Sequence, residues 1–196
     1  MTSKYASSGS WMHTYSGKRL HPLATSPEEI DIEDIAQGMA LTCRFGGQCA
    51  QFYSVAQHCY HLSYAVPEEF ALDALMHDAA EAYLTDVPSP AKDGLSEYRE
   101  VEDRLYEVIA RKFGLSFPIP KEVHDADKKI VVNEAEVVFN EVPDWVSGRP
   151  RLDIAPIHPM AWRSARRLWI RRFKELTDGS ALRSKRDCAT SSARSA

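Results

Sequence analysis

Residues 71–83 have the sequence ALDALMHDAAEAY, and this segment carries most of what the chain indicates about its fold. Ala, Leu, Met and Glu are strong helix formers, so the segment predicts a helix over about 68–83. The helix should stop at the turn TDVPSP over 85–90. Within it, Glu81 lies four residues after His77 and three after Asp78, which would place all three on one face. Because residues 72–84 are otherwise almost entirely apolar, some of these groups must be buried, and a metal ion is one partner that buried ionisable groups accept.

Helical periodicity continues on both sides of this segment. Apolar residues recur at spacings of three and four, and Gly114 fits the end of the longest such run. We therefore predict an all-α fold with a single helical bundle over 30–177. Outside it we expect an irregular N-terminal segment over 1–29, which Trp11, Tyr15 and Leu20 would anchor to the body, and a disordered tail over 178–196. The expected helices span about 30–43, 53–64, 68–83, 96–113, 121–139 and 160–176, with a loop over 143–159.

Length and composition are those of a single globular domain. The chain has 196 residues, of which 44% are apolar and 27% charged, and a net charge of −4 argues against a stable nucleic-acid partner. No apolar run approaches the roughly 18 residues that a membrane span needs. The cysteines at 43, 49, 59 and 188 form no CxxC pair, and no apolar signal region precedes them. We therefore expect a cytoplasmic protein with reduced thiols.

Further candidate ligands lie upstream and downstream of the His-Asp pair. His58 lies in AQHCYH at 56–61, and Asp127 lies in VHDADK at 123–128. Together with His77 and Asp78 they would offer one divalent cation two imidazoles and two carboxylates, a mixed set suited to Mn, Co, Fe, Zn or Ni. A lone His-Asp dipeptide often occurs by chance, so the ordered series His, His-Asp, Asp on predicted helices is the informative feature. His61 and His124 are better interpreted as surface or supporting residues, and Glu134 as supporting or structural.

This ordered series resembles the HD superfamily of metal-dependent phosphohydrolases, of the phage and prophage type. The similarity includes residues 32–36 (IEDIA), 43–45 (CRF), 52–58 (FYSVAQH), 74–83 and 86–92 (DVPSPAK), and it covers roughly residues 11–176. The chain is similar to bacterial 5′-deoxynucleotidases and to small phage triphosphohydrolases, including those that act on dATP. The resemblance implies a single HD-domain helical bundle, a homo-oligomer, and a bacterial or phage-infected cytoplasm.

The resemblance also implies roles for individual residues. His58, His77, Asp78 and Asp127 would hold a divalent metal ion (Co, Mn, Zn or Mg). Glu81 and Asp86 would be catalytic residues beside it, near the attacking water or a second cation, and Arg44 would clamp a substrate phosphate. Lys92 is a second candidate phosphate contact, with a solvated turn lysine as the alternative. An Asp before Val-Pro-Ser-Pro also favours a turn, so a structural role in the turn is the alternative for Asp86.

The expected reaction is metal-dependent hydrolysis of a (deoxy)nucleotide at its α-phosphate. A triphosphate substrate of the dATP type would yield nucleoside and triphosphate, and a monophosphate would yield nucleoside and phosphate; the metal motif does not choose between them. Relatives of the prophage type often have Gly-His where this chain has Gly47-Gln48, so strict dATP selectivity is not predicted.

Two other functions compete with a deoxynucleotide hydrolase: a hydrolase of another phosphorylated signalling nucleotide, and a non-catalytic nucleotide-binding module. The arginines of the segment 160–176 are interpreted as a solvated face, with substrate contact across a subunit interface as the alternative.

Overall fold

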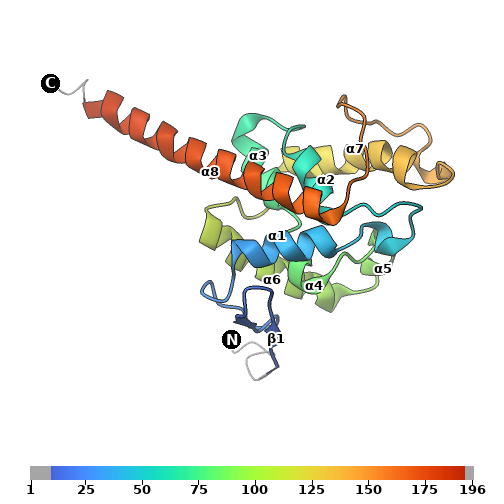
Figure 1. Ribbon diagram of the computed structural model, residues 1–196, viewed down its shortest axis with the longest axis horizontal. Helices are drawn as coiled ribbons and strands as arrows, with labels where there is room; N and C mark the ends of the chain where they lie inside the picture. The colour runs from blue at the N-terminus through green and yellow to red at the C-terminus, as the bar shows by residue number, and fades with distance from the viewer. Residues whose placement is uncertain (1–9, 193–196) are drawn as a thin grey trace.

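The chain folds as a mostly helical protein, which confirms the predicted all-α class (Figure 1). The computed structural model describes the backbone of residues 10–192 and the side chains of 10–178. The α-helices are α1 (Ile32–Leu41), α2 (Val55–Leu62), α3 (Ala71–Met76), α4 (Glu81–Leu84), α5 (Ser89–Lys92), α6 (Ser96–Phe113), α7 (Lys121–Val138) and α8 (Trp162–Ser192). The 3-10 helices are η1 (Phe45–Gly47), η2 (Glu68–Phe70) and η3 (Asp144–Val146), and the strands β1 (Met12–His13) and β2 (Arg19–Leu20) form a short antiparallel hairpin.

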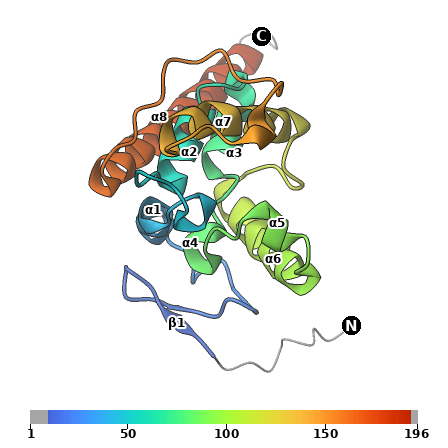
Figure 2. The ribbon, with the colours of Figure 1, turned by 90° about the vertical axis from the view of Figure 1, so that its right-hand side faces the viewer.

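The core lies where α8 crosses α1, α2 and α3. All three helices contact α8, which runs along one side of the bundle (Figures 1 and 2). Trp169 of α8 is fully buried, its indole Nε1 donates to the carbonyl oxygen of Leu75 at 3.0 Å, and its ring stacks on Phe173. This hydrogen bond satisfies the one polar atom of the side chain. The contact fixes the end of α3 immediately before His77.

Residues 10–31 pack against the bundle, although through other residues than those expected. Leu20 is fully buried, as predicted, whereas Trp11 is 45% exposed and lies beside Arg19 of the same segment, so the prediction that Trp11 anchors the segment is wrong. Tyr15 is 65% exposed, but its ring lies beside the partly buried guanidinium of Arg166 on α8, so it contacts the body at its edge. The polar anchor is the buried Asp34 of α1, which accepts hydrogen bonds from the backbone N–H and the hydroxyl of Ser16 at 2.5 and 2.9 Å. Residues 1–9 of the predicted N-terminal segment lie outside the described residues.

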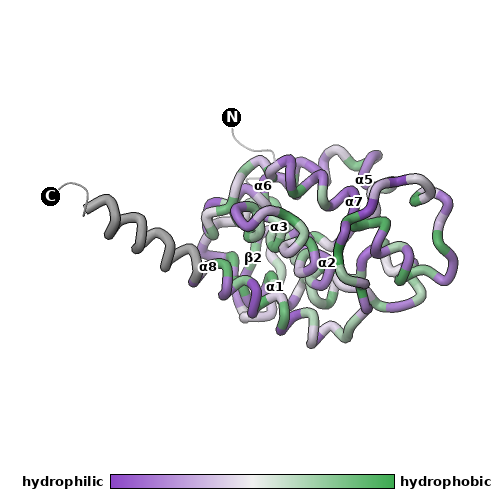
Figure 3. Tube along the Cα trace, turned by 90° about the horizontal axis from the view of Figure 1, so that it is seen from above, coloured by the Kyte–Doolittle hydropathy of each residue, from purple (hydrophilic) through white to green (hydrophobic). Residues whose placement is uncertain are grey.

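Local sequence signals account for several helix ends. Asp31 accepts from the Glu33 amide at the start of α1, and Ser54 accepts from the Gln57 amide at the start of α2. At the end of α6, Gly114 adopts φ 69°, and its N–H donates to the carbonyl of Ala110. Hydrophobic and hydrophilic residues are interspersed along the helices, as expected of amphipathic helices that pack one face against a core (Figure 3).

The predicted helix over 68–83 is broken at the His-Asp pair. α3 ends at Met76, α4 begins at Glu81, and residues 77–80 form turns. Backbone hydrogen bonds here join residues three apart, as from the Glu81 amide to the Asp78 carbonyl at 2.9 Å. The prediction of one continuous helix face for His77, Asp78 and Glu81 is therefore wrong. The tightened backbone turns Asp78 and His77 toward α2.

The final helix is longer than the pattern predicts. α8 continues from Trp162 to Ser192, beyond the expected end near Leu176. Most of the predicted disordered tail falls on residues whose side chains are not described, and residues 193–196 lie outside the described chain, so that prediction stays a prediction. The described residues contain no helix with the length and apolar character needed to cross a membrane.

Candidate metal centre

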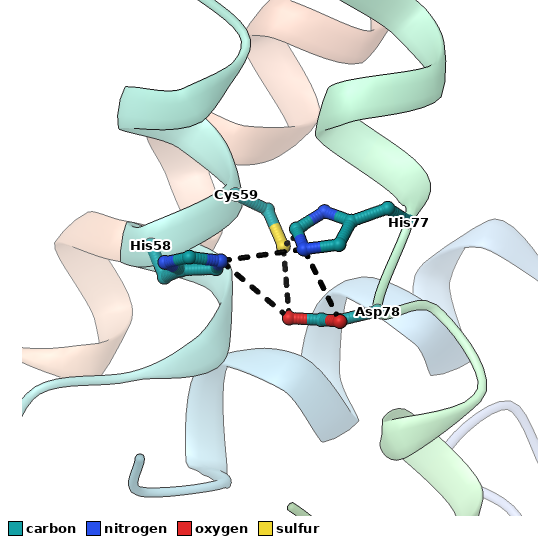
Figure 4. A group of neighbouring side chains, drawn as sticks. All are labelled: His58, Cys59, His77 and Asp78. Atoms are coloured by element: carbon teal, nitrogen blue, oxygen red, sulfur yellow. Dashed lines mark hydrogen bonds and ion pairs between the residues drawn. The ribbon is translucent and has the colours of Figure 1, made fainter. Parts of the chain in front are cut away.

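One helix and one turn bring the first group of candidate ligands together. His58 and its neighbour Cys59 lie on α2, both fully buried, whereas His77 and Asp78 come from the turn after α3 (Figure 4). Their ligand atoms lie within 4.8 Å of one another, so this group can hold a metal ion.

The distances suit ligands that share one cation. His58 Nε2 lies 3.3 Å from His77 Nε2 and 3.6 Å from Asp78 Oδ2, and His77 Nε2 lies 3.2 Å from Asp78 Oδ1. Atoms about 2.1 Å from one ion are separated by roughly 3.0–3.4 Å in tetrahedral or cis-octahedral positions. Asp127 Oδ1 lies 3.2 Å from His58 Nε2 and 3.9 Å from His77 Nε2, so α7 brings the fourth predicted ligand to the same point.

The other ring nitrogens of both histidines are already occupied. His58 Nδ1 lies 2.5 Å from Glu134 Oε1, and His77 Nδ1 lies 2.9 Å from the carbonyl oxygen of Ala74. Carboxylate and carbonyl oxygens only accept, so both Nδ1 atoms must donate a hydrogen. In the neutral rings the lone pairs are therefore on the Nε2 atoms, which face each other across the cluster.

Cys59 was not anticipated as part of this cluster. Its sulfur lies 3.6 Å from His77 Nδ1, the nitrogen that donates to Ala74, and 3.9 Å from Asp78 Oδ2. Burial, followed by the negative charge of Asp78, holds the pKa of the Cys59 thiol well above its usual range. Because Cys59 belongs to the group of possible ligand atoms while Asp127 Oδ1 lies 3.2 Å from His58 Nε2, both residues are candidates for the fourth donor. In the sequence, the one feature that points to Cys59 as a possible ligand is its position directly after His58.

Arg44 and Glu134 form a buried ion pair behind the histidines. Arg44 Nη2 lies 3.1 Å from Glu134 Oε2, and Arg44 Nη1 lies 3.6 Å from Asp78 Oδ2. Burial opposes the charge on Arg44, but Glu134, Asp127 and Asp78 raise its pKa well above the usual value. Burial and Arg44 also oppose protonation of His58, yet Glu134 and Asp127 outweigh them, and the pKa of His58 is about 9.

The predicted acids Glu81 and Asp86 lie near the cluster. Glu81 is 5% exposed, and its Oε2 atom has no hydrogen-bond partner among the described residues. Burial and the neighbouring charges of Asp78 and Asp86 hold the pKa of Glu81 well above its usual range. Burial also raises the pKa of Asp86, against the positive charge of Arg44. Glu81 is therefore a carboxyl group with a raised proton affinity beside a candidate metal centre.

The surroundings of Lys92 argue against a solvated turn lysine, while its role as a phosphate contact stays a prediction. It lies at the end of α5 rather than in a solvated turn, and its Nζ is 2.8 Å from Glu102 Oε1 and 3.8 Å from Glu81 Oε1. Burial lowers the pKa of Lys92, but the hydrogen bond that Lys92 donates to Glu102, and the negative charge of Glu102, raise it overall. Glu102 on α6 is a second residue that sequence reasoning missed.

The loop that carries Arg44 has two cysteines at its base. Cys43 Sγ and Cys49 Sγ lie 3.6 Å apart, and both are free thiols. A hollow of about 390 Å³ lies on this loop. Its lining comprises Gly47, Gln48, Cys49, Ala50, Phe139, Asn140 and Glu141, and contains none of the predicted metal ligands.

Several arginines of α8 have partners within the described chain. Arg166 pairs with Glu33 of α1, and Arg172 contacts Ser63 and lies over the ring of Tyr64. Both are largely buried, so the prediction of a solvated face is wrong for these two residues. The exposed Arg171, which pairs with Glu175 one turn later, agrees with it. Substrate contact across a subunit interface stays a prediction.

Comparison with known proteins gives the family. Over 172 residues the chain is 36% identical to the Escherichia coli K12 protein named "Uncharacterized protein YfdR", an alignment that covers 86% of this chain and 97% of YfdR. The chain belongs to the YfdR family. It is also 35% identical over 157 residues to "Uncharacterized protein RCAP_rcc00048" of Rhodobacter capsulatus, covering 71% of the chain and 80% of that protein. No family model matches the chain. The names of YfdR and of the second relative state no reaction.

Proposed function

We propose that this protein is a divalent-metal-dependent phosphohydrolase of the HD type, which hydrolyses deoxynucleotides at the α-phosphate. The observation that carries the proposal is the convergence of His58 Nε2, His77 Nε2 and the carboxylates of Asp78 and Asp127. Four of these atom pairs lie 3.2–3.6 Å apart, close to the spacing of ligands around one ion, and His77 Nε2 lies 3.9 Å from Asp127 Oδ1. Both Nδ1 atoms donate elsewhere. These four residues are the proposed metal ligands, with Co, Mn, Zn or Mg as the candidate ions.

A divalent cation at this point would supply Lewis acidity, which makes a water more acidic and draws charge from a phosphoryl oxygen. The side chains around it supply the remaining functions. Arg44, 3.6 Å from Asp78, is positioned to hold a phosphate oxygen beside the ligands, and a planar guanidinium can do so through two parallel hydrogen bonds.

Glu81 is the proposed general base. Its buried Oε2 atom is free to accept a hydrogen bond from the attacking water, and its raised pKa gives it a greater proton affinity than an ordinary carboxylate has. Lys92 lies 3.8 Å from Glu81, so its charge stabilises the carboxylate before the proton arrives. Asp86 carries a raised pKa as well and is the proposed second acid, which would return a proton to the leaving nucleoside oxygen.

The reaction then forms one P–O bond to water and breaks the bond between the α-phosphorus and the 5′ oxygen. A deoxynucleoside triphosphate gives nucleoside and triphosphate, and a monophosphate gives nucleoside and phosphate. The site geometry serves both substrates equally. A cytoplasmic location and a homo-oligomer accompany this proposal as predictions.

The test is a substrate panel of deoxy- and ribonucleotide mono- and triphosphates, assayed with Mn, Co, Mg or Zn in turn. The proposal predicts metal-dependent release of triphosphate or phosphate, and the Asp78→Ala variant should release neither. Triphosphate from dNTPs would identify a triphosphohydrolase, and phosphate from monophosphates alone would identify a 5′-nucleotidase. No release with any metal would refute the proposal and favour another phosphorylated ligand or a binding role.

A further inference from the structure

Glu134 is a fully buried carboxylate that contacts two different parts of the site. It lies on α7, with 0% of its surface exposed, and its two oxygens face different partners. Oε1 accepts from His58 Nδ1 at 2.5 Å, while Oε2 lies 3.1 Å from Arg44 Nη2. We propose that Glu134 is a positioning residue that orients the metal ligand His58 and the phosphate-binding Arg44 at once, and so couples cation binding to phosphate binding. This inference rests on the proposed function.

The first contact fixes the histidine. An ionised carboxylate has no hydrogen to donate, so His58 Nδ1 must carry one, and in the neutral ring the lone pair is then on Nε2. That nitrogen points at His77, Asp78 and Asp127. A carboxylate behind a histidine ligand holds the ring orientation and makes the ligating nitrogen more basic. Glu134 therefore prepares His58 for a cation.

The second contact fixes the arginine. Only 12% of the Arg44 side chain is exposed, and its Nε atom has no hydrogen-bond partner among the described residues. Glu134 Oε2 likewise makes no hydrogen bond to any described residue. Its contact with Arg44 Nη2 at 3.1 Å is therefore an ion pair without hydrogen-bond geometry. The ion pair leaves Nη1 on the side of Asp78, where a substrate phosphate would meet the cation.

Charge gives a second reason for coupling. A guanidinium and a divalent cation that both lie beside Asp78 would repel each other, and Glu134 supplies a negative charge that touches Arg44 and the histidine ligand. A buried carboxylate costs stability unless it is well paired, and replacing a buried ion pair by apolar residues is often neutral or stabilising. The carboxylate at position 134 is therefore better explained by the site than by the packing of α7.

The matched variants are Glu134→Gln and Glu136→Gln. Glu136 lies on the same helix but is exposed and bonds to Arg151 at 3.1 Å, so its substitution controls for a lost carboxylate on α7. Mn²⁺ is titrated calorimetrically into each full-length, metal-free protein, and inorganic phosphate is then titrated at saturating Mn²⁺. Glu134→Gln should weaken Mn²⁺ binding by roughly 10–100-fold, the usual loss for a second-layer partner of a metal ligand. It should weaken phosphate binding as well, while Glu136→Gln should match the wild type in both.

Wild-type affinities for Mn²⁺ and phosphate in Glu134→Gln would overturn the inference. Circular dichroism establishes that the variants fold. Should Glu134→Gln fail to fold, Glu134→Asp keeps the charge but is too short to reach both partners, so it must lose affinity for at least one ligand; full affinity for both would also overturn the inference. A wild-type protein that binds Mn²⁺ and phosphate but hydrolyses no nucleotide would refute the proposed function alone, whereas one that binds no divalent cation would refute both.

Discussion

His58 Nε2 and His77 Nε2 lie 3.3 Å apart, although the two residues come from α2 and from the turn after α3. Each ring is held from behind, His58 by Glu134 and His77 by the carbonyl of Ala74. When His58 is neutral, both rings present their Nε2 lone pairs to the same point, beside the carboxylates of Asp78 and Asp127. Because the pKa of His58 is about 9, a proton on its Nε2 occupies this place in the metal-free protein, and a divalent cation would displace that proton. Two imidazoles and two carboxylates form a donor set that suits such a cation.

The identity of the fourth ligand can be tested by comparing Asp127 with Cys59. Asp127→Ala should lose more Mn²⁺ affinity than the roughly 10–100-fold that an outer partner costs, because it removes a donor to the cation itself. Cys59→Ala should keep nearly the wild-type affinity, because the pKa of the Cys59 thiol is raised and its sulfur lies on the Nδ1 side of His77. Calorimetric titration measures both. Tight binding by Asp127→Ala together with weak binding by Cys59→Ala would reverse the assignment.

Glu81→Gln separates chemistry from metal binding. We expect kcat to fall by about 10²–10⁴-fold, because the amide cannot accept the proton of the attacking water. Mn²⁺ affinity should change little, since Glu81 is not among the proposed ligands. Glu107→Gln is the control, because this half-exposed residue pairs only with Arg111 at 3.3 Å among the contacts described for it. Unchanged turnover in Glu81→Gln would remove Glu81 from the mechanism.

Gly38→Ala should destabilise the crossing of α1 and α4. A Cβ at Gly38 would lie 2.4 Å from the carbonyl oxygen of Ala82, and backbone cannot move aside as a flexible side chain can. Overpacking of this kind costs roughly 1–3 kcal/mol of unfolding free energy. Chemical denaturation measures the loss, with Gly94→Ala as the control, because its Cβ would meet only an ordinary contact at 3.7 Å. Equal stabilities of the two variants would show that the α1–α4 crossing is looser than described.

Asp31 gives a prediction about pH. The amide of Glu33 lowers the pKa of Asp31 below its usual 3.8, against a smaller opposing effect of burial, and Lys18 lowers it further. A lowered folded-state pKa stabilises the protein above about pH 4, and this contribution is lost as the pH falls through the folded pKa. At pH 7 the free energy of unfolding should therefore be roughly 0.3–1 kcal/mol higher for the wild type than for Asp31→Asn, because a negative charge at the start of α1 is stabilising.

The same comparison at low pH provides the check on Asp31. Denaturation curves of both proteins at pH 7 and at pH 2.5 should show the difference shrinking at the lower pH, because protonated Asp31 and Asn are both neutral caps. A difference that is independent of pH would mean that the Asp31 charge contributes nothing to stability.

Helices with a regular apolar stripe could be predicted closely from the sequence. α6 spans the predicted 96–113, and α7 differs from the predicted 121–139 by one residue at its end. In both cases proline and glycine signals delimit the helix. The ligand series His58, His77, Asp78 and Asp127 also converges as expected, because three separate helical segments bring it together.

The features that the sequence did not predict depend on tertiary contacts. The segment 71–83 is rich in helix formers, yet it breaks after Met76, where His77 donates to the Ala74 carbonyl and Ala82 packs against Gly38. Helix propensity is a weak local preference that such contacts override. The bridging role of Glu134 depends on Arg44, which is 90 residues away in the chain and has no pattern in common with it.

The most direct test of the metal centre is an anomalous diffraction map from crystals grown with Mn²⁺. We predict one strong peak about 2.0–2.2 Å from His58 Nε2, His77 Nε2 and carboxylate oxygens of Asp78 and Asp127, the usual range for such ligands. The peak should be lost in Asp78→Ala. A wild-type map with no peak at this point, or with the cation held by other residues, would refute the proposed metal centre.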